Sequence, residues 1–117
     1  MATITATVTR AKSWADAWVV KWETMGDADT GSTVEMVEAN DKSVQIAGTF
    51  GSATVVLQGS NDGTNWATLA DPQGTAISKT AAAIEQVLEH TRYIRAVTSG
   101  GTGTDIDVTV FMRGQRN

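Results

Sequence analysis

Side chains that could carry out catalysis are few in this chain of 117 residues. Its one histidine, His90, follows Glu89 at the end of an expected strand, and no nucleophile with an orienting partner can be named beside it. The glycine-rich run TSGGTGTD at residues 98–105 lacks the lysine of a phosphate-binding loop and precedes an expected strand, not a helix. We therefore predict a protein that is not an enzyme and has no small-molecule substrate.

Oxygen-bearing side chains gather in two short turns, DADTG at residues 27–31 and NDGTN at residues 61–65. Oxygen ligands of this kind suit calcium, but neither run matches the calcium loop that ends in a bidentate glutamate. Turns closed by Asn and Asp side chains account for both runs. The chain also has no cysteine, which excludes a thiolate zinc site and a disulfide framework. We predict no metal and no cofactor.

The tryptophans are the strongest sign of contact with another molecule. Three of the four, Trp14, Trp18 and Trp22, fall within nine positions at a spacing of four, which places them on one face of a helix or of a strand. The run WVVKWET favours a strand. Tryptophan is common both in cores and at interface hot spots, so both interpretations stay open for these three rings. Trp66, which follows a turn, is expected in the core.

The net charge of −4 comes from thirteen acidic and nine basic residues. Nucleic-acid binding rests on a basic face, so this balance argues against a nucleic-acid partner. Six of the acids fall between residues 23 and 41, where a solvated surface is expected. No apolar run is long enough to span a membrane, and the N-terminus lacks the order of a signal peptide. We expect a protein made in the cytoplasm, with no membrane partner.

Apolar residues recur at every second position, the period of half-buried antiparallel strands. In DIDVTVFM, for example, Ile106, Val108 and Val110 alternate with polar neighbours. Turn signals rich in Gly, Asn and Asp separate such runs. The expected strands lie near residues 2–10, 14–24, 32–39, 43–50, 53–60, 65–70, 84–89, 92–99 and 104–113. The pattern predicts one all-β domain over residues 1–117, an antiparallel β-sandwich of jelly-roll type with at most one short helix.

One segment fits this pattern poorly. Residues 79–89, KTAAAIEQVLE, have an alanine-rich helix propensity and could form one or two helical turns. The alanine triplet is equally compatible with a tight crossing between sheets.

The run VVLQGSNDGTNWATL at residues 55–69, followed by RYIRAV at residues 92–97, resembles the core of discoidin-like jelly-roll domains. In that family a strand ends in a Ser-x-Asp-Gly hairpin turn, a tryptophan packs behind the turn, and a later strand with two arginines pairs alongside. The resemblance assigns five residues to the structural hairpin and core: Asp62, Gly63, Trp66, Tyr93 and Arg95. The long ligand-binding loops and the terminal disulfide of the discoidin family have no counterpart here.

In length and in its run of residues the chain is more similar to small virion proteins of tailed bacteriophages, over roughly residues 42–113. Several of these resemble capsid decoration (cement) proteins, which sit as trimers on the outer shell. The resemblance implies a structural protein on the capsid exterior, whose partners are the major capsid protein and itself, as a homotrimer. Residues 1–22 would then be a contact arm or an edge strand, with Trp14 and Trp18 as anchors. The alternative is a carbohydrate-binding module or a receptor-binding tail component.

Overall fold

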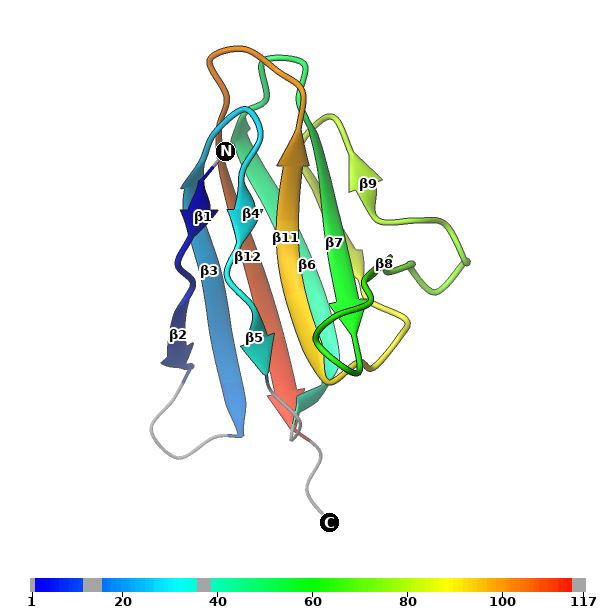
Figure 1. Cartoon of the computed structure of the whole chain (residues 1–117). Coiled ribbons are helices and arrows are strands. Elements are labelled where there is room, and N and C mark those ends of the chain that lie inside the picture. Colours follow the sequence, from blue (N-terminus) through cyan, green and yellow to red (C-terminus); the bar gives the residue numbers. More distant parts are fainter. Residues whose placement is uncertain (1, 12–15, 36–38, 115–117) are drawn as a thin grey trace.

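The computed structural model describes residues 2–11, 16–35 and 39–114. Within those residues the chain is all-β, without a helix, and its strands form two sheets packed face to face (Figure 1). The predicted all-β sandwich is therefore confirmed. The finer assignment to the jelly-roll type stays a prediction.

The first sheet has seven strands, most of them short. Its path is β1-β4-β11-β7-β8, while β5 also pairs with β11 and β9 also pairs with β7. All of its pairings are antiparallel except that of β1 with β4, which is parallel. The strands are β1 (Thr3–Ile4), β4 (Thr30–Gly31), β5 (Val34–Glu35), β7 (Thr54–Ser60), β8 (Ala67–Thr68), β9 (Ser78–Lys79) and β11 (Tyr93–Ser99).

The second sheet has five strands in the order β10-β6-β12-β3-β2, all antiparallel. Three long strands form its centre, and two strands of four residues form its edges. Because four antiparallel steps separate β2 from β10, these two edge strands run in the same direction. The strands are β2 (Thr7–Arg10), β3 (Ala17–Met25), β6 (Ala39–Thr49), β10 (Ala83–Gln86) and β12 (Asp105–Gly114).

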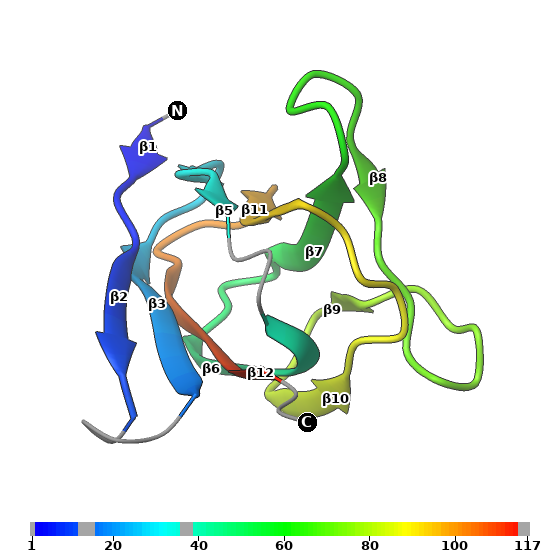
Figure 2. The same cartoon turned by 90° about the horizontal axis from the view of Figure 1, so that it is seen from below.

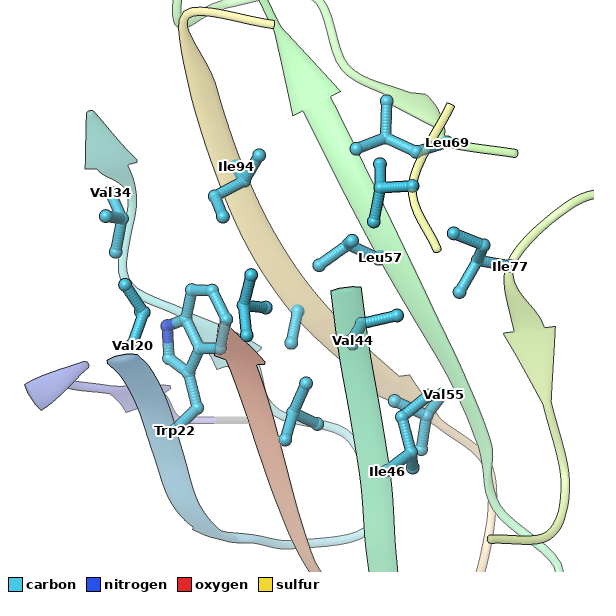
Figure 3. Close-up of a cluster of buried hydrophobic side chains, with 14 of the residues drawn as sticks. Val20, Trp22, Val34, Val44, Ile46, Val55, Leu57, Leu69, Ile77 and Ile94 are labelled. Carbon is cyan, nitrogen blue, oxygen red and sulfur yellow. The ribbon is translucent and has the colours of Figure 1, made fainter. Parts of the chain in front are cut away.

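The core lies between the sheets and follows the predicted alternation (Figure 3). Ile106, Val108 and Val110 of β12 are fully buried, whereas the residues between them are at least partly exposed. Branched aliphatic side chains suit this position because they pack well on a pleated surface. The largest buried side chains are Trp22, Met25, Ile46, Leu57, Ile77, Ile94, Ile106 and Met112.

The chain crosses from one sheet to the other at both flanks of the sandwich (Figure 2). At one flank β1 belongs to the first sheet, and β2, which follows directly, belongs to the second. At the other flank β9 belongs to the first sheet and β10 to the second. Both edges of the second sheet are therefore formed by short strands that follow a crossing.

The segment at residues 79–89 makes one of these crossings. β9 ends at Lys79, and β10 occupies Ala83–Gln86, so the helical alternative is wrong. The Lys79 ammonium lies 2.8 Å from the Glu85 carboxylate and ties the two ends of the crossing together. Pairing with β6 along the whole of β10 overrides the local helix propensity of the alanines.

Candidate interaction surfaces

Trp22 lies in the core and not at an interface. Its side chain has no exposed surface, and its Nε1–H donates a hydrogen bond of 3.0 Å to the Ser32 carbonyl. Gly31 lies against the indole, since a Cβ placed there would be 2.6 Å from Nε1. The interface interpretation is therefore wrong for Trp22. Trp22 is two residues from the buried Val20 on β3, so strand alternation places both side chains on the core-facing side.

Trp18 is half-buried at the start of β3. One side of the ring packs against the core cluster. The Arg10 guanidinium carbon lies 5.6 Å from the ring centre, and the two residues are cross-strand partners in β2 and β3. Trp14, the other predicted anchor, lies outside the described residues.

β2 is an edge strand whose four residues are all exposed. The Ala11 N–H donates to the Ala17 carbonyl at 2.8 Å, so Thr9, two residues earlier, also directs its backbone groups to β3. The N–H and C=O groups of Val8 and Arg10 therefore point to the free edge. Across the described part of the chain they have no backbone partner.

The predicted contact segment, residues 1–22, is not a separate arm where the structure describes it. β1 pairs with β4, β2 pairs with β3, and both Ile4 and Ala6 pack against the core. Both strands are edge strands, β1 of the first sheet and β2 of the second.

β10 forms the opposite edge of the second sheet. The Val87 N–H donates to the Lys42 carbonyl at 3.0 Å, so Glu85 also directs its backbone groups to β6. The backbone groups of Ile84 and Gln86 therefore face outward, like those of Val8 and Arg10 on β2. The Ile84 side chain is 67% exposed.

The turn between β7 and β8 is closed by its own side chains. Hydrogen bonds of 2.8 Å from the Asn65 and Thr64 N–H groups to Asp62 Oδ1 hold the pKa of this carboxyl well below its ordinary value. Ser60 Oγ accepts the Gly63 N–H at 2.9 Å, and Gly63 has a φ of 77°, in the left-handed region that favours glycine. Asp62 and Gly63 thus lie at a rigid corner of the scaffold.

Trp66 follows this corner and lies half-buried on the outer face of the first sheet, so the prediction that it belongs to the core is wrong. The Arg95 guanidinium carbon lies 4.1 Å from the ring centre, and Arg95 Nε donates to Gln58 Oε1 at 2.8 Å. Tyr93 shares this face of β11 with Arg95, whereas Ile94 between them is buried. The alternation of β11 explains the placement of all three.

A shallow groove of about 290 Å³ lies on the second sheet. Phe111 is 45% exposed there, and Arg113 pairs with Asp41 at 3.2 Å. An aromatic ring beside amide, hydroxyl and charged groups can bind a sugar or a peptide. The lining residues are Asp41, Lys42, Ser43, Gln86, Phe111 and Arg113.

Lys42 is a buried charged residue that the sequence interpretation passed over. It is only 4% exposed, and its Nζ lies 3.1 Å from His90 Nδ1. Burial lowers the pKa of Lys42, while the Asp41 carboxylate acts in the opposite direction. The alternation of the strand could have predicted this burial, because Lys42 falls on the same face as Val44 and Ile46, which the sequence places inward.

Among the residues that the structure describes, no group of three or more His, Cys, Asp or Glu side chains is placed to hold a metal ion. Nor do they include a helix long and apolar enough to cross a membrane. No protein-family model matches the sequence, and no curated protein matches it.

Proposed function

We propose that this protein is a non-enzymatic structural protein of a tailed-bacteriophage virion. It decorates the outside of the capsid as a homotrimer and bridges neighbouring subunits of the major capsid protein. The observation that carries this proposal is the unpaired edge of β2, where the backbone groups of Val8 and Arg10 face outward. An unpaired edge is a template for pairing with another chain.

The surroundings of β2 support an interface at this edge. Val8 is 46% exposed, and Trp18 is half-buried beneath the Arg10 guanidinium. Trp and Arg are among the residue types that carry most binding energy when a partner covers them. A partner that covered β2 would complete the burial of Trp18 and satisfy the edge of the sheet together.

Bridging accounts for how such a protein could stabilise a shell. Each trimer contacts several coat subunits, so it leaves the lattice only when all of these contacts are lost at once. A ligand that binds only the assembled state also stabilises that state by mass action. The similarity of roughly residues 42–113 to small virion proteins of tailed bacteriophages supports the same assignment.

Co-sedimentation with undecorated phage capsids tests the proposal. We expect the intact protein to pellet with capsids and to saturate at a fixed ratio to the coat subunits. Bovine serum albumin at the same concentration serves as the control for trapping. A chain that stays in the supernatant at every capsid concentration contradicts the proposal.

The groove beside Phe111 favours a carbohydrate-binding module or receptor-binding tail component as a second candidate. Its exposed ring, the Gln86 amide and the Ser43 hydroxyl are groups that contact sugars. A glycan array separates the two functions. Saturable glycan binding that Phe111→Ala abolishes, together with no capsid binding, supports this second candidate.

A further inference from the structure

The two free edges of the second sheet match each other in direction. β2 and β10 run the same way, so a neighbouring copy in the same orientation would present β10 parallel to β2. Each edge also offers the same backbone pattern. Two residues direct their N–H and C=O groups to the free edge, and the residue between them directs these groups to the neighbouring strand of its own sheet. The two outward-facing residues are Val8 and Arg10 on β2 and Ile84 and Gln86 on β10.

Parallel pairing brings equivalent faces of the two edges together. In a parallel ladder an outward-facing residue bonds to the two residues that flank its opposite neighbour. Arg10 would therefore lie opposite a residue of β10 that bonds to β6, which is Ala83 or Glu85. The Arg10 side chain shares the core-facing side of its sheet with Trp18, and the Glu85 side chain shares that side with Val44. Parallel pairing thus keeps the two core-facing sides continuous.

Charge selects one register among these. Arg10 is the charged residue of β2, and Glu85 is the charged residue of β10. The Glu85 side chain is 28% exposed in spite of its pair with Lys79, so a second cation can reach it. Placing Arg10 opposite Glu85 sets Thr9 opposite Ile84, which covers the most exposed large apolar side chain among the described residues.

We propose that copies of this chain associate edge to edge, with β2 of one copy paired in parallel with β10 of the next and Arg10 opposite Glu85. The contact is heterologous, so a suitable rotation between copies closes it into a ring. The inference rests on the self-association in the proposed function but not on the capsid. It names the strands and the register that hold the copies together.

Cross-linking tests the register. The chain has no cysteine, so introduced thiols are unique. Within one copy, residues 9 and 84 lie on opposite edges of the sheet, roughly 19 Å apart for four strand spacings, too far for a disulfide. Mixed Thr9→Cys and Ile84→Cys chains should form a heterodimer under mild oxidation, and the double variant should form larger covalent rings. The control pair Thr9→Cys with Gln86→Cys, two residues further along the same face of β10, should cross-link at least about fivefold less.

A charge reversal tests the contact independently. Arg10→Glu and Glu85→Arg should each weaken self-association in sedimentation equilibrium by about tenfold or more, because like charges then face each other. The double reversal should recover the wild-type affinity to within about threefold, and Arg95→Glu, on the outer face of the first sheet, should change it less than about twofold. Thermal unfolding of each variant verifies that it is folded.

Each outcome decides the inference. Heterodimers of the stated pair together with rescue by the double reversal support it. No rescue, or equal cross-linking in the control pair, overturns the register. A wild-type chain that stays monomeric at all concentrations overturns edge pairing. If that monomer still pellets with capsids, the capsid-binding part of the proposed function stands without this inference. If the chain forms a ring that does not bind capsids, this inference stands and capsid decoration is contradicted.

Discussion

Arg95 lies over the ring of Trp66, with its guanidinium carbon 4.1 Å from the ring centre, and the pair lies on the outer face of the first sheet. The Arg95 Nε hydrogen bond to Gln58 fixes the guanidinium in this position. A tryptophan held in this way contributes less to stability than one in the core, because part of its ring remains in contact with solvent and only part is packed against protein atoms.

The two tryptophans should therefore differ in the cost of their removal. We expect Trp66→Ala to lower the free energy of unfolding by about 1–2 kcal/mol, the range of a partly desolvated cation–π contact. Trp22→Ala should lower it by about 3–5 kcal/mol, as for a buried aromatic ring. Urea denaturation followed by circular dichroism measures both. Equal losses would show that Trp66 is as much a part of the core as Trp22.

Gly63 should be sensitive to side-chain shape. At a φ of 77°, a β-branched residue is strained, so Gly63→Val should cost about 1–3 kcal/mol of stability. Gly63→Asn is the matched control, because Asn tolerates the left-handed region, and it should cost clearly less. The comparison uses the same urea titration. If Val and Asn are equally tolerated, the turn does not need its left-handed corner.

Asp62 should make stability fall at acidic pH. Its pKa is lower in the folded protein than in the unfolded chain, so ionised Asp62 stabilises the fold above the ordinary carboxyl range near 3.8. This contribution is lost as the pH falls through that value towards the folded pKa. The melting temperature of wild type should therefore drop more steeply than that of Asp62→Asn between about pH 4 and about pH 2. If the melting temperatures of the two proteins fall equally steeply with pH, Asp62 does not contribute to stability in acid.

The packing around Gly31 should leave no room even for the methyl group of an alanine. A Cβ at this position would lie 2.6 Å from Trp22 Nε1 and 2.9 Å from the Ala96 carbonyl oxygen. Gly31→Ala should cost about 1–3 kcal/mol, the range for overpacking a core. Gly26→Ala, which would meet only the Asp29 side chain at 3.0 Å, is the milder control. Differential scanning calorimetry that finds the two variants equally stable contradicts this packing.

The sequence predicts most of the architecture, because alternation depends on local residues. The inward set Ile106, Val108 and Val110 could be read directly, and so could the turn around Asp62 and Gly63. The helical alternative at residues 79–89 failed because pairing with β6 is a non-local contact, which propensity does not contain.

The interaction surfaces were harder to predict than the strands. A spacing of four puts Trp18 and Trp22 on the same face of β3, so it could not distinguish the buried Trp22 from Trp18, which is half-buried at the start of the strand. The free edges of β2 and β10 depend on the strand order of the whole sheet. Alternation marks which residues share a face but not which strand has only one neighbour.

The most direct test of the central claim uses proline at the free edge of β2. The Val8 N–H points away from β3, so Val8→Pro removes an outward donor without breaking a bond within the sheet, the placement that edge strands tolerate. Thr9→Pro is the control that breaks pairing with β3 and should unfold the edge. The measurement is co-sedimentation of Val8→Pro and wild type with undecorated capsids, beside light scattering of each protein alone. Our account predicts that Val8→Pro is folded, is monomeric and stays in the supernatant, whereas a Val8→Pro chain that assembles and pellets like wild type contradicts it.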